Sequence, residues 1–380
     1  MTIERRTRTV QADPFALLQE PDTGLWDDGD LSIFQGVALE IVAEGPTRFR
    51  DVRAIAEALG APDAVFFGGF SFQDGPPTEP WTLPSARFIL PERIITWRDG
   101  VANETRFEVH GERVAAPTTV QPGPKNPSSS RSHWRDAVKE ALQAIEDGDA
   151  TKVVLSRCKQ ISRQDPVGMV EKLRAAEPGT TRFLFRHGEH AFYGATPETL
   201  VKLDGRVWTH ALAGTSPTGD DSLLQSPKDL LEHELVVTYL RGRLESAGAT
   251  GLEQGRRRLK TLRHVQHLET PIEADARGKH VLELAEALHP TPAVGGLPPR
   301  RSAELIRSLE GYPRGWYAGA VGWFDGRGRG QFNVALRCAL ATPDTTWLFA
   351  GAGIVAGSEP DAEWEETERK LATFEELHEQ

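Results

Sequence analysis

Glu363, Glu366 and Lys370 follow a glycine-rich segment, GAGIVAGSEP, near the end of the chain. Pro360 suits the first turn of a helix, and spacings of three and four place the three charged residues on one helix face. Two carboxylates on that face could hold a hard divalent cation, and the ammonium group one turn later could meet an anion beside it. The same pattern is also typical of a solvated charged face.

Lys152 and Glu198 are ionisable residues at the ends of apolar, strand-like runs. Lys152 begins KVVLSR, and desolvation of a lysine that enters a core lowers its pKa, which makes it a usable general base. Glu198 lies in GATPETLV, and a carboxyl group beside apolar residues can stay protonated and serve as a general acid. The structural alternatives are a strand-end lysine that reaches water and a glutamate that opens a helical turn.

Glu232 lies in the sequence EHE, near the start of a long helix predicted from Ser226 onward. Its carboxylate could share a metal ion with the terminal helix. A surface ion pair with Lys228, four residues earlier, is the simpler account. The segment lacks the second histidine of a zinc-protease helix, which excludes that class.

Glycine-rich segments recur in LAGTSPTG, which contains Gly214 and Thr215, and in GAGI, which contains Gly351 and Gly353. Neither has the strand–GxGxxG–helix context of a dinucleotide site, and no phosphate-binding GKS or GKT sequence is present. Such glycines allow close approach of the backbone, whose amides could bind a carboxylate. Simple turns are the alternative.

The elements that must position these residues are predicted to be hairpin-like strands with interspersed helices. Two strands, WYAGAVGWFD and QFNVALRCALA, flank the turn-rich GRGRG, and LVKLDGRVWTHAL folds about an Asp-Gly turn. Because no βαβ period repeats, this order favours an α+β fold with large antiparallel sheets. Helical patterns are predicted over residues 134–148, 167–175, 226–247, 281–288 and 302–309.

A segment rich in Pro and Ser, residues 117–132, is predicted to be a linker or long surface loop. Residues 1–116 contain short strand-like runs and few clustered ionisable groups, so we expect a β-rich scaffold within the same domain. Residues 133–380 contain all the candidate site residues and are expected to form the catalytic region.

Composition narrows the classes of function. The chain has 380 residues and a formal charge of −11, which argues against a general nucleic-acid binder. Any anionic substrate must be captured by local cations or a metal ion. The two cysteines, Cys158 and Cys338, are expected to be core thiols in a reducing compartment. Because no secretory signal or membrane-length apolar run is present, a cytoplasmic protein without membrane contact is expected.

Taken in order, these motifs resemble the chorismate-utilising enzymes, the family of anthranilate synthase component I. The resemblance covers residues 130–378 and is closest to the isochorismate synthases, whereas the N-terminal third is similar mainly through FFGGFSF. It implies two large stacked antiparallel sheets with peripheral helices, a site at their interface, and Mg2+ as cofactor. The motifs are KVVLSR, GATPETLV, ALAGTSPTG, SPKDLLEHELVV, VQHLETPIEA, LHPTPAVGG, RGWYAGAVGWFDGRGRGQFNVALRCA and GAGIVAGSEPDAEWEETERKLA.

The resemblance also implies a role for each motif residue. Lys152 matches a base that activates water and must be neutral, whereas Glu198 matches a general acid that must hold its proton. Glu232 and Glu366 match the carboxylates that bind Mg2+, with Glu363 in the metal shell. The residues that match substrate-binding positions are Gly214, Thr215, Tyr317, Arg337, Gly351, Gly353 and Lys370.

The implied activity is conversion of chorismate to isochorismate, by addition of water at C2 and loss of the C4 hydroxyl. Lys152 stands where relatives that install an amino group carry Gln, and Ala213 stands where aminodeoxychorismate-forming relatives carry lysine. Water is therefore the expected nucleophile, and no amidotransferase subunit is expected. A salicylate synthase, which goes on to eliminate pyruvate, and an inactive metabolite-binding relative are the alternatives.

The sequence leaves three further points open. The product could feed menaquinone or siderophore synthesis. Gln331 stands where the family usually has an acidic residue; we expect it at a turn–strand junction, with little effect on chemistry. No exposed heptad or amphipathic dimer helix stands out, so a monomer is expected.

Overall fold

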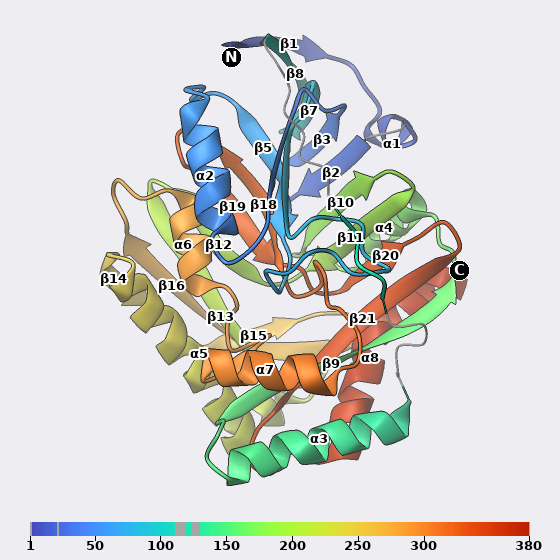
Figure 1. Cartoon of the computed structure of the whole chain (residues 1–380), viewed down its shortest axis with the longest axis vertical. Helices are drawn as coiled ribbons and strands as arrows, with labels where there is room; N and C mark the ends of the chain where they lie inside the picture. The colour runs from blue at the N-terminus through green and yellow to red at the C-terminus, as the bar shows by residue number, and fades with distance from the viewer. Residues whose placement is uncertain (1, 21–22, 111–118, 124–129, 380) are drawn as a thin grey trace.

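Two large antiparallel sheets dominate the structure, a computed structural model that describes residues 2–20, 23–110, 119–123 and 130–379 (Figure 1). The α+β class predicted from the sequence is thereby confirmed. Of the expected linker, residues 117–118 and 124–129 lie outside the described residues. In its described part, Gln121 forms a bridge with Thr78, and the first helix after it begins at Arg131.

The first sheet has eleven strands, in the order β1-β8-β7-β3-β2-β10-β11-β20-β21-β9-β17. Its N-terminal strands are β1 (Thr2–Val10), β2 (Thr23–Asp27), β3 (Leu31–Gln35), β7 (Arg93–Arg98) and β8 (Val101–His110). Its remaining strands are β9 (Lys152–Ser162), β10 (Thr181–His187), β11 (His190–Thr196), β17 (Gly296–Leu297), β20 (Cys338–Ala341) and β21 (Thr345–Ile354).

The second sheet has ten strands, in the order β14-β16-β13-β12-β19-β18-β5-β6-β4, with β15 paired to β16 off this path. Its N-terminal strands are β4 (Leu39–Ala43), β5 (Val65–Phe70) and β6 (Ala86–Leu90). The others are β12 (Thr199–Asp204), β13 (Arg206–Pro217), β14 (Thr250–Gln254), β15 (Arg258–Thr261), β16 (Val265–Asp275), β18 (Ala320–Asp325) and β19 (Gly330–Val334).

Helices cover the outside of the sheets (Figure 1). Helix α2 packs on β4 and α6, whereas α3 packs on β9 and α8, and α8 in turn packs on β21. The helices are α1 (Pro14–Leu18), α2 (Arg48–Ala58), α3 (Arg131–Glu146), α4 (Pro166–Ala176), α5 (Pro227–Ser246), α6 (Val281–Leu288), α7 (Pro299–Leu309) and α8 (Pro360–Glu379), with a short 3-10 turn at Asp221–Gln225. None of the described helices is long and apolar enough to span a membrane.

The signals for α5 and for the β12–β13 hairpin are confirmed. Ser226 caps α5, because its hydroxyl accepts the Asp229 N–H, and Pro227 occupies the first turn. Asp204 lies opposite Arg206 across the predicted Asp-Gly turn. These features are local, so the sequence alone determines them.

The prediction of one strand over QFNVALRCALA is wrong. Strand β19 belongs to the second sheet and β20 to the first, so residues 335–337 cross from one sheet to the other. The crossing bends the backbone enough to place Arg337 at a φ of 47°. Likewise, WYAGAVGWFD is a strand only from Ala320 onward. The crossing is what brings Arg337 to the junction of the two sheets.

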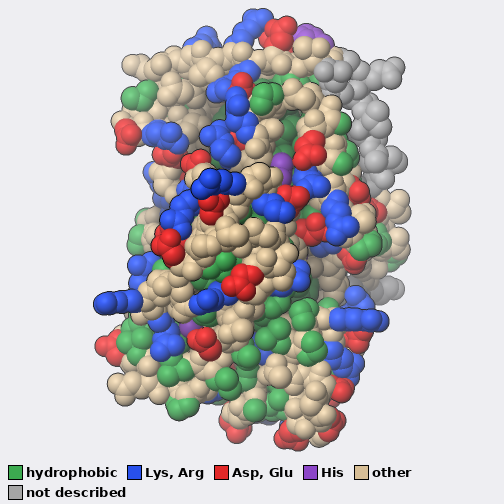
Figure 2. Space-filling view, turned by 90° about the vertical axis from the view of Figure 1, so that its left-hand side faces the viewer, with side chains coloured by type: hydrophobic (Ala, Val, Ile, Leu, Met, Phe, Trp, Pro, Cys, Tyr) green, Lys and Arg blue, Asp and Glu red, His purple; other side chains and the backbone are tan. Residues whose placement is uncertain are grey.

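The core lies between the sheets and is rich in aromatic residues. Phe70 from β5 contacts Phe88 from β6 and Phe332 from β19, and all three are fully buried. Both cysteines are buried free thiols, as predicted. Figure 2 shows the face over α2 and α6, where basic side chains are interspersed with acidic ones on the described surface.

Candidate active site

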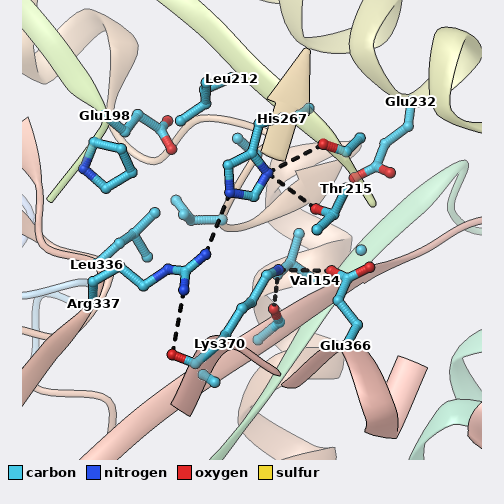
Figure 3. Close-up of a pocket in the computed structure, with 18 of the residues that line it drawn as sticks. Val154, Glu198, Leu212, Thr215, Glu232, His267, Leu336, Arg337, Glu366 and Lys370 are labelled. Carbon is cyan, nitrogen blue, oxygen red and sulfur yellow. Dashed lines mark hydrogen bonds and ion pairs between the residues drawn. The ribbon is translucent and has the colours of Figure 1, made fainter. Parts of the chain in front are cut away.

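A pocket at the junction of the two sheets gathers most of the predicted site residues (Figure 3). All of them except Lys152 and Glu363 line it. Its walls come from β9, β13, β16, β21, α5 and α8, together with the 197–198 link and the 335–337 crossing. The apolar part of the lining includes Val154, Leu212, Val294, Leu336 and Phe349.

Glu198 is fixed in the two-residue link between β11 and β12. Its backbone N–H donates to Thr196 Oγ1 at 3.2 Å, and its carbonyl accepts from Val334 N–H at 3.0 Å. The residue is only 3% exposed, and this burial raises the pKa of its carboxyl to about 8, although Lys152 pulls the other way. At neutral pH the group therefore holds a proton, which is the state that a general acid needs.

Lys152 is fully buried at the first position of β9, beside the pocket rather than in its wall. Its Nζ lies 2.8 Å from Oε1 of Glu232, on α5. Ser302 donates its hydroxyl to the Lys152 carbonyl at 3.1 Å, which fixes the backbone of the strand end. The strand-end lysine that reaches water, the structural alternative, is thus excluded.

Glu232 and Glu366 face the pocket from α5 and α8, and each pairs with a lysine. Burial disfavours the charged form of Glu232, but the lysines around it, Lys152 first among them, hold the pKa of its carboxyl below the usual range. Oε1 of Glu366 lies 2.6 Å from Nζ of Lys370, which also donates to the Gly351 carbonyl at 2.7 Å (Figure 3).

Glu363 lies outside the pocket lining and is 2% exposed. Its Oε1 accepts from Nζ of Lys228 at 2.7 Å, which links α8 to the start of α5. Burial and the neighbouring Glu366 raise the pKa of the Glu363 carboxyl, and Lys228 opposes that rise. The surface alternative for the face of α8 fails, since this carboxyl group is buried.

The carboxylates of Glu232 and Glu366 are suitable donors for a hard cation, although Lys152 and Lys370 now neutralise them. The space beside them is kept open by Gly353, where a Cβ would collide with the Glu232 carboxylate. Among the described residues, the one set of three His, Cys, Asp or Glu side chains with ligand atoms within 4.8 Å of each other is Glu4, Glu108 and His110 on the exposed β1–β8 pair. The carboxylate oxygens of Glu232, Glu363 and Glu366 therefore do not all lie within 4.8 Å of one another.

Arg337 and His267 are joined across the pocket (Figure 3). Arg337 donates from Nη1 to the Lys370 carbonyl at 3.3 Å, and its Nη2 lies 3.4 Å from Nε2 of His267. The other ring nitrogen of His267 lies 3.1 Å from Thr215 Oγ1 and 3.2 Å from the Gly214 carbonyl. Burial, with help from Arg337, lowers the pKa of His267, so the ring is neutral.

His267 was missed as a functional residue, although it belongs to the motif VQHLETPIEA. Its role depends on contacts with β13 and with the crossing segment, which the strand pattern does not reveal. Asp229 was missed for the same reason: it accepts the Thr215 N–H at 3.3 Å, and its Cβ would lie 3.1 Å from a Cβ on Gly214. Gly214 also has a φ of 76°, a left-handed backbone conformation that favours glycine there.

A buried network of charged residues, Arg314 and Glu310, supports the ring of Tyr317. Its ring packs over Arg314, which donates to the carbonyls of Val154 and Val294, both in the pocket wall. Glu310 completes the network, because it pairs with Arg314 and accepts from Ser156. None of the candidate motifs pointed to this support for the wall.

Known proteins share both the sequence and the fold. The chain is 36% identical to the salicylate biosynthesis isochorismate synthase of Pseudomonas aeruginosa, with 92% of this chain and 83% of that protein covered. It is also 36% identical to isochorismate synthase MenF of Bacillus subtilis, with 81% and 73% covered. The structure of MenF, the menaquinone-specific isochorismate synthase of Escherichia coli, has the same fold, with a TM-score of 0.84 at 23% identity over 99% of this chain and 94% of that one.

The family description "Chorismate binding enzyme" matches residues 102–377, which include every predicted site residue. That range covers all of the pocket lining and confirms the resemblance seen in the motifs. The chain belongs to the chorismate-binding enzyme family.

Proposed function

We propose that the protein is an isochorismate synthase, which converts chorismate to isochorismate. The observation that carries the proposal is the protonated, buried Glu198 in the same pocket as Arg337 and Lys370, with the buried Lys152 beside it. The names of the two curated relatives support the same activity. The pocket contains one proton donor and cations for an acidic substrate, and the proposed amine base lies beside it.

The charges of the site suit the two carboxylates of chorismate. Arg337 and Lys370 supply two cations in the pocket wall, whereas Glu232 and Glu366 supply two anions and Glu198 stays neutral near pH 7. We assign binding of the substrate carboxylates to Arg337, Lys370 and the Tyr317 hydroxyl. The backbone at Gly351 and Gly353 allows the ligand to approach closely, and Gly214 and Thr215 line the ring.

In the proposed reaction, water adds at C2 and the hydroxyl at C4 departs. Lys152, in the neutral form that this step requires, takes a proton from the attacking water, and Glu198 gives its proton to the departing hydroxyl, so that water leaves. The ring double bonds shift between the two centres. One proton enters the lysine as one leaves the glutamic acid, and the net charge of the site is unchanged over the step.

We assign Mg2+ as the cofactor, held by Glu232 and Glu366, with Glu363 behind them. When bound, the ion supplies positive charge that anchors a substrate carboxylate. The residues of the chain do the rest: Gly353 leaves room beside Glu232, and the Lys228–Glu363 pair fixes α8 against α5.

The test is to incubate the protein with chorismate and Mg2+ and to separate the products. Isochorismate alone is expected. Salicylate with pyruvate would instead identify a salicylate synthase, and unchanged chorismate would identify an inactive relative. Lys152→Ala and Glu198→Ala should each remove most of the turnover while the circular dichroism spectrum is retained; full activity in either variant would contradict the assigned roles.

A further inference from the structure

The backbone amide of Thr199, the residue after Glu198, is bonded to a side chain and not to a neighbouring strand. Strand β12 pairs with β19 at Thr199 and again at Val201, so a bulge lies at Leu200. The ladder from β12 to β13 on the other side stops at Lys202. The N–H of Thr199 is partly buried and takes its partner from a side chain, because an amide removed from water without a partner is costly.

His210 of β13 supplies that partner. Its Nε2 lies 2.9 Å from the Thr199 nitrogen, and the ring is 2% exposed. Since the amide can only donate, Nε2 must be unprotonated, and the ring proton must reside on Nδ1. Nδ1 lies 2.8 Å from Oε1 of Glu269, on β16, which accepts that proton in a hydrogen bond. The carboxylate thus selects the tautomer that the Thr199 amide requires.

Glu269 is itself anchored from the side facing solvent. Arg258 of β15 donates to its Oε2 at 2.6 Å, and Nζ of Lys260 lies 3.6 Å from its Oε1. The carboxylate is 4% exposed, and these partners, with His210, lower its pKa to about 2 against the effect of burial. The Glu269 carboxyl is therefore ionised near neutral pH and accepts the hydrogen bond from His210 Nδ1.

We propose that His210, oriented by Glu269, is a positioning residue for the general acid Glu198. The line Glu269–His210–Thr199 N–H fixes the residue that follows Glu198, just as Thr196 and Val334 fix the backbone of Glu198 itself. The link can then neither swing out toward water nor change the direction in which the carboxyl group points. This inference rests on the proposed function, in which Glu198 delivers the proton.

A second line of side chains reaches the same residue from β19. Gln331 donates to Oδ1 of Asn333 at 3.0 Å, and Nδ2 of Asn333 lies 3.4 Å from Thr199 Oγ1. Gln331 is 5% exposed near the start of β19, as the sequence predicted. Its amide thus completes the support of Thr199 from the side opposite His210.

Three substitutions separate this role from simple packing. In His210→Gln the amide oxygen takes the place of Nε2 and can still accept the Thr199 N–H, whereas His210→Asn can reach only Glu269. His210→Leu makes neither bond. We expect the Leu and Asn variants to lose about 10- to 100-fold in kcat with little change in the KM for chorismate, since a small misplacement of a catalytic group costs that much. The Gln variant should keep most of the activity.

Thr209→Val is the matched control. In the wild type, the fully buried Thr209 hydroxyl donates to the Leu200 carbonyl at 2.7 Å, between the same two strands. Within the described part of the chain, it makes no bond to the backbone of Glu198 or Thr199. The Val variant should lower thermal stability as much as the His210 variants while leaving kcat intact. Equal kcat in wild type and His210→Leu would overturn the proposal, and so would equal losses in the Gln and Asn variants.

A readout without substrate distinguishes this proposal from the proposed function. The infrared band of the protonated Glu198 carboxyl, identified by its absence in Glu198→Gln, is titrated in each variant. The charged groups around it, Lys152, Lys260 and Lys370, are kept in all of them. In His210→Leu the band should disappear at lower pH than in wild type, because a loosened link admits water, whereas His210→Gln should match wild type. An unchanged midpoint in His210→Leu would contradict the positioning role even if the wild-type protein left chorismate untouched.

Discussion

At the scale of the residue, the proposed general acid Glu198 would couple activity to stability. Its carboxyl has a pKa of about 8 in the folded protein against 4.5 for the ordinary group, with burial as the first cause. Between these values the native state binds more protons than the unfolded state, so stability falls as the pH rises. In the proposed reaction the same ionisation removes the general acid, so kcat should fall as the pH rises through about 8.

Glu198→Gln separates the two effects. Because the amide carries no charge at any pH, the variant should gain melting temperature relative to wild type at pH 9, by roughly 2 °C or more, and little at pH 5. It should at the same time lose most of its turnover at every pH. Melting curves at both pH values test this, and a stability difference between variant and wild type that is the same at pH 5 and pH 9 would contradict the raised pKa.

Gly353 is required for a different reason, which is the space beside Glu232. In Gly353→Ala the new methyl group would collide with the Glu232 carboxylate and press on the Lys152 side chain. We expect a loss of about 100-fold in kcat/KM, since both groups belong to the site, with folding retained. Gly242→Ala, on α5 with no atom near the new methyl group, is the control and should keep full activity. Activity of Gly353→Ala equal to that of the control would exclude the close packing.

At the scale of the element, the sequence predicts what depends on neighbours along the chain. The cap and proline of α5, the Asp-Gly turn after β12 and the strand that begins at Lys152 all follow from local chemistry. The crossing at 335–337 does not, because both halves of QFNVALRCALA are almost entirely buried and no break in periodicity marks the change of sheet. The Lys152–Glu232 and Arg337–His267 contacts were likewise hidden, since they join residues about 70 or more positions apart.

That crossing makes Arg337 hard to replace. Its backbone has a positive φ. One guanidinium nitrogen donates to the Lys370 carbonyl, while the other lies against His267 Nε2. Lysine cannot reproduce this fork. Arg337→Lys should therefore raise the KM for chorismate by about 10-fold or more with a smaller effect on kcat. Steady-state kinetics test this, and a KM equal to that of wild type would contradict a substrate-binding role for Arg337.

Two carboxylates of helix α8, those of Glu363 and Glu366, have different environments, and they give a matched pair of variants. Glu366 faces the pocket, whereas Glu363 is paired with Lys228 outside the lining. If Glu366 holds the proposed Mg2+, Glu366→Gln should raise the Mg2+ concentration needed for half-maximal activity by about 10-fold or more, because the charge of one ligand is lost. Glu363→Gln should raise it less. An Mg2+ titration of both variants tests the assignment, which fails if Glu366→Gln titrates as wild type does.

At the scale of the whole molecule, the N-terminal third completes both sheets. Strand β2 pairs with β10 in the first sheet, and β5 pairs with β18 in the second. The phenylalanines of β5 and β6 also pack on those of β18 and β19 in the common core. The pocket lies at the junction of the same two sheets, so its walls depend on both being whole.

This arrangement predicts that residues 131–380 do not fold alone, although they contain every site residue. Without β2 and β5, the edges of β10 and β18 are unpaired and a large part of the aromatic core is exposed, which favours aggregation. The isolated fragment should elute as an aggregate and melt without a cooperative transition, whereas the full chain gives one. Gel filtration and thermal circular dichroism test this. A monomeric fragment that melts cooperatively and turns over chorismate would show instead that residues 1–116 form a separable domain.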